Sequence, residues 1–270
     1  MGSILDKLRI KPGTTVNLDK IDPEDTPGCS DKEEGLARFT EHIERLSVLQ
    51  YMLYAEAKRS VLVVLQGIDA GGKDGTIRKV MSGLNPQGVS VTSFKAPAGE
   101  EKEHGYLWRV YRSTPRYGQI GIFNRSHYED VLIARVRSLV EEKVWTKRYN
   151  QINNFEEMLA ENGTTVVKFF LYISKDEQKK RFQERIEDPE KNWKFNPADL
   201  EERKYWDDYI RAYEAVLDKC SKSHAPWYVI PANRKWYRNL AVAEILRDTM
   251  EGMDMKYPPP IADLSRIRFE

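Results

Sequence analysis

A glycine-rich segment offers the clearest chemistry in this sequence. It matches the pattern G-x-x-x-x-G-K from Gly67 to Lys73, directly after the short apolar run 61–65. In this pattern the glycines let backbone N–H groups point inward, while the following helix start and the lysine add positive charge. The sequence therefore predicts a phosphate-binding loop; the alternative is a plain glycine-rich turn. The other expected members of the loop are Ala70, Gly71, Gly72, Asp74 and Gly75.

Two carboxylates accompany this loop. Asp74 stands where Ser or Thr usually offers a hydroxyl to Mg²⁺, and Asp69 lies inside the loop. A carboxylate beside bound phosphates repels them unless a divalent cation lies between. We therefore expect Asp69 to bind Mg²⁺ or to act as a base for an attacking phosphate. The alternative is an Asx turn that shapes the loop.

A second polar block follows the apolar run 119–123. Ligands of open α/β sheets collect beyond the carboxyl ends of the strands, which is where Arg125 would emerge. A planar guanidinium suits a phosphate group because it donates two parallel hydrogen bonds. Glu129 and Asp130 follow and could hold a metal, although acidic residues also simply complement a helix N-terminus. His127 has no triad partner nearby, so we expect it to be structural or solvated.

Cations gather in the segment 179–204. Acidic residues alternate with them, which is typical of a solvated helix face. Two large aromatics in Trp193-Lys194-Phe195 require burial or a partner, and they favour a helical lid that closes cations over phosphates. The eight cations are Lys179, Lys180, Arg181, Arg185, Lys191, Lys194, Arg203 and Lys204. Two further basic sets are Arg109, Arg112 and Arg116, and Arg234, Lys235 and Arg238.

Five apolar runs would position these groups. They carry many β-branched residues with little polar alternation, which is typical of strands buried on both faces of a parallel sheet. Patterns of helical period separate them, and strands that alternate with helices predict an α/β doubly wound sheet. The runs are 61–65, 89–94, 119–123, 165–173 and 227–230.

The chain divides into three parts. Turn signals such as Pro12-Gly13 and Pro27-Gly28 predict an irregular N-terminal arm over residues 1–31. Residues 32–257 are expected to form a single domain, with the lid at about 179–204 as an excursion above the sheet. Residues 258–270 form a C-terminal tail without a helical or strand pattern.

Composition excludes several classes of protein. The 270 residues carry 43 Lys and Arg against 42 Asp and Glu, so a uniformly basic nucleic-acid or membrane binder is excluded. No apolar run approaches the roughly 20 residues that cross a bilayer, and no signal peptide is recognisable. Cys29 and Cys220 cannot form a disulfide framework. We expect a soluble cytoplasmic protein with no nucleic-acid partner and no membrane partner.

These motifs together resemble the polyphosphate kinase 2 family over about residues 54–257. The combination is far more specific than a phosphate loop alone. The matching segments are GIDAGGKDG from Gly67, FNRSHYED from Phe123, PEKNWKF from Pro189, APWY from Ala225 and KWYR from Lys235.

The resemblance implies a P-loop kinase fold like that of thymidylate kinase, with a five-stranded parallel sheet and a helical lid. It implies Mg²⁺-dependent phosphoryl transfer between inorganic polyphosphate and a nucleotide, with Mn²⁺ as a possible substitute. The residues implied as catalytic are Asp69, Lys73, Arg125 and Asp130, of which Asp69 and Asp130 would hold the metal. Arg181, Arg185 and Lys194 would grip phosphates from the lid, and the nucleotide would contact Arg109, Asn124 and Glu129. From its residue type, Phe94 is expected to stack on the base, and the alternative is that it belongs to the core.

One departure concerns the acceptor. Many family members carry Asp directly before the arginine of the second block, whereas this chain carries Asn124. Together with Glu129, this resembles the third class, which accepts nucleoside mono- and diphosphates. An amide removes a negative charge beside the acceptor phosphate, so broader acceptance is physically reasonable. A homo-oligomer is also expected. The rival readings are an ATP-dependent nucleoside monophosphate kinase and a non-catalytic module that binds polyphosphate or nucleotides.

Overall fold

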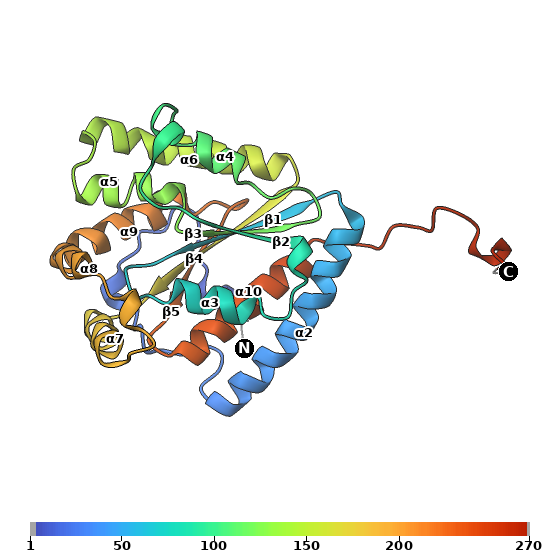
Figure 1. The fold of residues 1–270 in the computed structure, drawn as a ribbon, viewed down its shortest axis with the longest axis horizontal. Coiled ribbons are helices and arrows are strands. Elements are labelled where there is room, and N and C mark those ends of the chain that lie inside the picture. Colours follow the sequence, from blue (N-terminus) through green and yellow to red (C-terminus); the bar gives the residue numbers. More distant parts are fainter. Residues whose placement is uncertain (1–3, 269–270) are drawn as a thin grey trace.

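The fold is built around one parallel sheet in a computed structural model that describes residues 4–268. The strand order is β2-β3-β1-β4-β5, and every neighbouring pair is parallel. Figure 1 shows the strands crossing the centre of the molecule. The five predicted strands are confirmed. They are β1 (Ser60–Gln66), β2 (Val89–Ser93), β3 (Ile120–Asn124), β4 (Thr164–Tyr172) and β5 (Trp227–Pro231).

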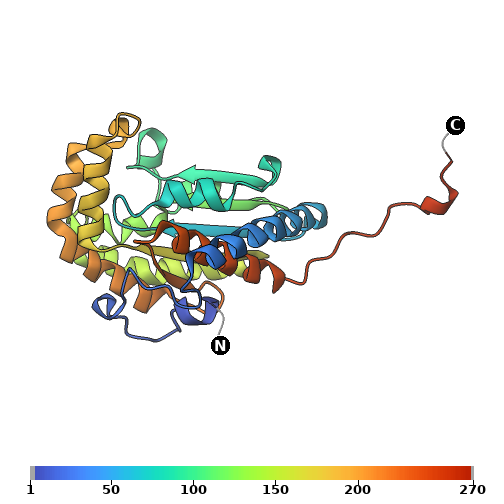
Figure 2. The same ribbon diagram turned by 90° about the horizontal axis from the view of Figure 1, so that it is seen from below.

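Helices cover both faces of this sheet (Figures 1 and 2). One layer consists of α2 (Lys32–Glu56), α3 (Lys73–Val80) and α10 (Lys235–Glu251). The other layer consists of α4 (Trp108–Arg112), α5 (Ile133–Val136), α6 (Glu142–Glu161) and α9 (Trp206–Cys220). This is the predicted P-loop kinase arrangement.

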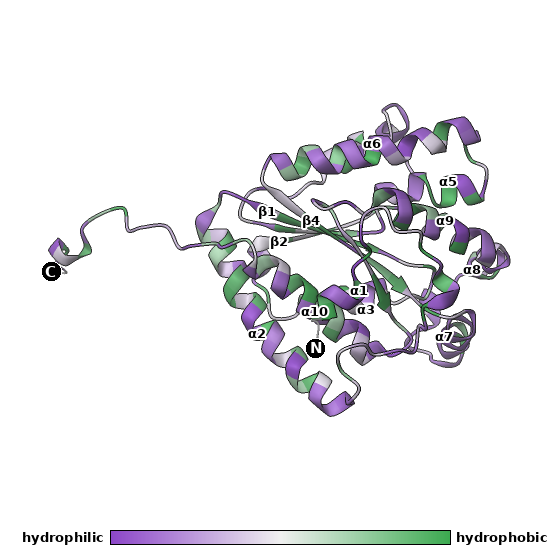
Figure 3. Ribbon diagram, turned by 180° about the vertical axis from the view of Figure 1, so that it is seen from behind, coloured by the Kyte–Doolittle hydropathy of each residue, from purple (hydrophilic) through white to green (hydrophobic). Residues whose placement is uncertain are grey.

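Strand β1 shows why two layers form. All seven of its residues are buried, and successive side chains point to opposite faces. Val61, Val63 and Leu65 enter one apolar core, whereas Leu62 and Val64 enter the other. Figure 3 shows hydrophobic residues concentrated in the sheet and polar residues on the outer sides of the helices. A strand buried on both faces explains the continuous apolar run in the sequence.

The expected lid lies beyond the carboxyl ends of the strands. It consists of α7 (Lys175–Glu187), a 3-10 turn (Asn192–Lys194), α8 (Pro197–Glu202) and a second 3-10 turn (Arg203–Tyr205), which leads into α9. Ser174 caps α7 by accepting a hydrogen bond from the backbone N–H of Glu177, and Asn196 caps α8 in the same way through Ala198. Figure 2 shows α7 and α8 standing at one end of the sheet.

The N-terminal arm is more ordered than the sequence suggested. It contains α1 (Ile4–Leu8) and a 3-10 turn (Leu18–Lys20), and Arg9 forms an isolated antiparallel bridge with Tyr228 of β5. Ile4, Leu8 and Leu18 are buried, so apolar contacts with the domain override the local turn signals. The expectation of an irregular arm is therefore wrong for α1.

The C-terminal tail extends away from the domain (Figures 1 and 2). Its side chains are exposed from Lys256 to Arg268, and it contains one 3-10 turn, Leu264–Arg266. Within residues 4–268, no helix is long and apolar enough to cross a membrane.

Candidate active site

The glycine-rich segment forms a tight loop between β1 and α3. Ala70 and Gly72 both adopt the left-handed backbone conformation, with φ angles of 62° and 99°. Gly72 is the N-cap of α3, so the loop delivers its backbone to the N-terminus of a helix that begins at Lys73. This geometry is suited to binding anions, because unpaired N–H groups and the helix dipole point the same way.

Lys73 is the central cation of the loop. Its Nζ donates a hydrogen bond to the carbonyl oxygen of Gly67 at 2.6 Å, and the residue is 9% exposed. Burial, together with the nearby Arg125, lowers the pKa of Lys73 to about 8, although Asp69 and Glu129 act in the opposite direction. The positive charge is therefore only partly compensated by the protein, and a bound phosphate would stabilise it.

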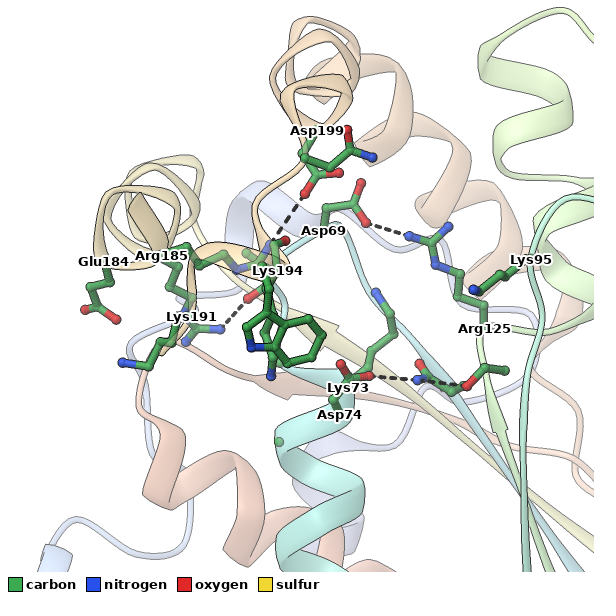
Figure 4. A pocket seen from close by; sticks show the side chains of 18 of the residues that line it. Asp69, Lys73, Asp74, Lys95, Arg125, Glu184, Arg185, Lys191, Lys194 and Asp199 are labelled. Carbon is green, nitrogen blue, oxygen red and sulfur yellow. Dashed lines mark hydrogen bonds and ion pairs between the residues drawn. The ribbon is translucent and has the colours of Figure 1, made fainter. Parts of the chain in front are cut away.

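Asp69 and Arg125 face each other across the loop. A guanidinium nitrogen of Arg125 lies 2.7 Å from Oδ1 of Asp69, as Figure 4 shows. Arg125 has a φ of 62°, and its backbone N–H donates to the carbonyl oxygen of Leu65. This turn at the end of β3 aims the guanidinium back toward the phosphate loop, as the strand-end argument predicted.

A cavity of about 760 Å³ opens in front of the loop (Figure 4). We call it the phosphate cavity. Cations outnumber carboxylates in its wall, so it favours ligands with several negative charges. Its cations are Lys73, Lys95, Arg125, Arg181, Arg185, Lys191, Lys194 and Lys235, and its carboxylates are Asp69, Asp74, Glu184 and Asp199.

Strand β3 and its neighbour β2 form one side of the phosphate cavity. The side-chain amide of Asn124 donates to Oδ1 of Asp74 at 2.8 Å and lies 3.5 Å from Oγ of Ser93. Asn124 therefore fixes the second loop carboxylate. Lys95 follows β2 on the same side.

The lid forms the opposite side, and its arginines differ in role. Arg181 is buried and donates to the carbonyl oxygens of Ala70 and Ala232 at 2.8 and 2.6 Å, while Glu177 pairs with it at 2.7 Å. It ties α7 to the phosphate loop. Arg185 is less constrained and lies 3.4 Å from Asp199. Arg185 and Lys194 are therefore free enough to meet a ligand in the cavity.

The two acidic residues of the second block point in different directions. Glu129 is surrounded by Lys73 and Arg125, and burial raises its pKa despite these cations. Asp130 instead pairs with Arg148 at 3.0 Å. Both lie in the 3-10 turn His127–Asp130, where three residues complete a turn and consecutive side chains diverge by about 120°.

The structure therefore does not bring Asp130 together with Asp69, against the expectation that the two share a metal ion. Glu129 takes the place near the loop. It lines a second cavity of about 220 Å³ that also includes Gly67, Asp69 and Arg125. The assignment of the metal to Asp130 came from the resemblance to the family, whereas residue type and spacing had offered Glu129 and Asp130 equally.

The remaining nucleotide-binding candidates lie beside the phosphate cavity. Phe94 lines it but is 5% exposed and packs edge-to-face against Phe123, so most of its ring belongs to the core. Arg109 stands over the Phe94 ring and donates to the carbonyl oxygen of Lys95. It lines an adjoining cavity of about 690 Å³ rather than the phosphate cavity.

Most of the predicted site residues converge on the phosphate cavity. Those that line it are Asp69, Ala70, Gly72, Lys73, Asp74, Gly75, Phe94, Asn124, Arg125, Arg181, Arg185 and Lys194. Gly71 does not line it; its N–H donates to the carbonyl oxygen of Ile68 within the loop.

Several lining residues were not among the predicted site residues. Lys95 could have been found, because the strand-end rule that located Arg125 applies equally to β2. Lys191, Trp193 and Lys235 lie in segments that the sequence marked as basic or unusual, but nothing distinguished them from their neighbours. Asp199 had no signal. The others are Ser93, Ala96, Glu184 and Asn196.

Metal binding must rest on few protein ligands. Over residues 4–268, no group of three or more His, Cys, Asp or Glu side chains is arranged to hold a metal ion. Mg²⁺ commonly binds through one or two carboxylates and takes its other ligands from substrate phosphates and water. Asp69, about a quarter exposed and facing the cavity, fits that type of site.

Comparison with known proteins agrees with this geometry. The family model for polyphosphate kinase 2 (PPK2) matches residues 29–258. An AMP/ADP-polyphosphate phosphotransferase of Meiothermus ruber is 52% identical, over 98% of this chain and 99% of that protein. An ADP-polyphosphate phosphotransferase of Rhodopseudomonas palustris is 48% identical, over 93% of this chain and 91% of that protein.

A solved structure extends the likeness to three dimensions. The crystal structure of polyphosphate kinase 2 from Arthrobacter aurescens TC1 superposes with a TM-score of 0.94 at 44% identity. The match covers 98% of this chain and 94% of that one. With the phosphate loop, the second block and the lid all in place around one cationic cavity, the chain belongs to the polyphosphate kinase 2 family.

Proposed function

We propose that this protein transfers the terminal phosphoryl group between inorganic polyphosphate and nucleoside mono- and diphosphates, converting AMP to ADP and ADP to ATP. The observation that carries the proposal is the phosphate cavity, where eight cations face four carboxylates beside a phosphate loop. Such an excess suits a chain of linked anions better than a single nucleotide. Relatives over nearly the full length that are named for AMP and ADP support the acceptor class. Guanine nucleotides are expected as further acceptors.

The chemistry needs positioning and charge neutralisation rather than a covalent intermediate. The N–H groups of the phosphate loop and Lys73 would hold the donor phosphates. Arg125, at 39% side-chain exposure, is free to leave Asp69 and stabilise charge on the transferred group. Closure of the lid, with Arg185 and Lys194, would exclude water and so limit hydrolysis.

Mg²⁺, or Mn²⁺ in its place, is part of this proposal. Asp69 would hold the ion, and substrate phosphates would complete its ligands. When bound, the ion neutralises phosphate charge and polarises the phosphoryl group. We do not assign Asp130 to this role, because it pairs with Arg148.

The acceptor range is assigned to Asn124 and Glu129. Asn124 places a neutral amide, already bonded to Asp74, at the edge of the cavity. A carboxylate there would add repulsion toward an acceptor phosphate. We therefore assign the protein to the third class of the family, which uses both mono- and diphosphates. The homo-oligomeric state and the cytoplasmic location expected from the sequence stay predictions.

The decisive experiment omits ATP. The protein is incubated with Mg²⁺, long-chain polyphosphate and AMP or ADP, and nucleotide products are separated by chromatography. The proposal expects ADP and ATP to form, and chelation of the metal to stop the reaction. Formation of ADP only when ATP replaces polyphosphate would identify a nucleoside monophosphate kinase. Polyphosphate binding without any product would identify a binding module.

A further inference from the structure

A buried arginine lies directly behind the phosphate loop. Arg238 belongs to the first turn of α10 and is 4% exposed. A Cβ atom built on Gly72 would lie 2.0 Å from its Nη1 and 3.0 Å from its Cζ, and one built on Gly75 would lie 3.4 Å from its Nη2. The guanidinium therefore fills a slot that a side chain at position 72 would occupy, and it lies within ordinary contact distance of position 75.

In the part of the chain that the structure describes, this guanidinium has no carboxylate partner. Its Nε and Nη2 both donate to the neutral side chain of Asn239, at 3.1 and 2.8 Å. Within residues 4–268 it forms no ion pair, whereas Arg181 on the other side of the loop is paired with Glu177. Burial and the like charge of Arg181 lower the pKa of Arg238 to about 10. A buried charge without a counter-charge is costly and requires an explanation.

We propose that Arg238 is a positioning residue of the phosphate loop, whose unpaired charge acts through Gly72 and Gly75 to bind the polyphosphate donor. The inference rests on the proposed function. An anion in front of the loop would supply the counter-charge that Arg238 lacks. Because this guanidinium is poorly solvated, its attraction to the anion is stronger than it would be in water.

The test compares three variants in the full chain. Arg238→Met removes the charge. Arg238→Lys keeps the charge but loses the planar guanidinium and its several N–H donors. Arg247→Met is the control. Arg247 lies on the same helix, two and a half turns further on, and already pairs with Asp248. Initial rates are measured against polyphosphate at saturating ADP. Thermal midpoints are measured with and without polyphosphate.

Arg238→Met is expected to raise the KM for polyphosphate about tenfold or more while kcat changes less than about threefold, since ground-state attraction is lost. Arg238→Lys should fall between Arg238→Met and the wild type. Without ligand, the melting temperature of Arg238→Met should equal or exceed that of the wild type, because an uncompensated buried charge is gone. Polyphosphate should raise the melting temperature of Arg238→Met less than it raises that of the wild type.

Other outcomes overturn the inference. An unchanged KM for polyphosphate in Arg238→Met would do so, as would a variant that melts earlier or fails to fold, since that marks a merely structural arginine. Equal losses in the Met and Lys variants would also count against it. Failure of the proposed function is distinguishable, because wild-type protein would then show no turnover. The polyphosphate-induced thermal shift would still report on Arg238.

Discussion

Two regions of this molecule bury positive charge in opposite ways. In the core between β4 and α6, Lys168 contacts a carboxylate oxygen of Glu156 and donates to Tyr128 Oη and the carbonyl oxygen of Cys220, both at 2.8 Å. His127 adds a fifth member, 3.1 Å from Glu156. Burial alone would raise the pKa of Glu156, but Lys168 and His127 outweigh it and the pKa is lowered.

At the phosphate loop Arg125 and Arg181 have carboxylate partners, but two other buried cations do not within the described residues. Among residues 4–268, Lys73 donates only to a carbonyl oxygen, and Arg238 only to the side-chain oxygen of Asn239. Burial lowers the pKa of both cations, to about 8 and about 10. The comparison teaches that burial by itself does not mark function in this fold. Cations whose counter-charge the protein leaves out mark the place where an anion binds.

The core cluster provides the largest expected effect. Lys168→Met leaves Glu156 buried without its main counter-charge, so the free energy of unfolding should fall by about 3–5 kcal/mol. Urea denaturation followed by circular dichroism measures the loss. Adding Glu156→Gln should recover most of it, because a neutral amide is less costly to bury. A loss below about 1 kcal/mol would break the contrast between the two regions.

Removing charge from the loop should affect rate rather than stability. Lys73→Ala and Asp69→Asn are each expected to lower the rate of ATP formation from polyphosphate and ADP by about a hundredfold or more, since preorganised charge is lost. Thermal melting should show Lys73→Ala at least as stable as the wild type, because the lost cation had no ion pair within residues 4–268. Near-normal turnover in either variant would contradict the assignments.

Titration of Lys73 offers a smaller effect with a definite sign. Its pKa falls from 10.5 in the unfolded chain to about 8 in the folded protein. Between these pH values the unfolded state binds more protons than the folded state. The contribution of Lys73 to the free energy of unfolding therefore rises with pH from about 8 to 10.5, and it is lost as the pH falls through 8. Activity should move the other way. The kcat/KM for polyphosphate should drop about tenfold between pH 7 and pH 9.

Comparing wild type with Lys73→Ala isolates this group from the many others that titrate in the same range. The difference in their unfolding free energies should change with pH above 8, as measured by urea denaturation at several pH values. A flat difference, together with a flat kcat/KM profile, would show that Lys73 keeps its proton throughout.

The sequence predicted most of the sheet well because β1, β3, β4 and β5 are short, apolar and almost wholly buried, so their signal is local, whereas β2 is partly exposed. The phosphate loop was equally accessible, since the glycine spacing and the strand before it carry the whole pattern. The N-terminal arm was less accessible. Ile4 and Leu8 lie in α1, which contacts β5 and α10, elements more than 200 positions away in the sequence.

The site beyond the loop was predicted only in part. Arg125 followed from its place after β3, but the divergence of Glu129 and Asp130 depends on a 3-10 turn that no residue pattern announces. The slot of Arg238 depends on the distance between α10 and the phosphate loop, and sequence spacing does not predict that distance. Both cases require three-dimensional packing.

The smallest expected effect completes the comparison with a matched pair. Lys143 and Glu141 lie at 2.6 Å with side chains 76% and 71% exposed, so they are a Lys–Glu pair in water. Lys143→Met should change the free energy of unfolding by less than about 0.5 kcal/mol, because solvent and salt screen the attraction. Urea denaturation beside Lys168→Met measures both in one series. If the two substitutions lowered the free energy of unfolding by the same amount, the buried pairing of Lys168 would contribute no more than a pair in water. Compensation of charge would then not distinguish the core from the loop.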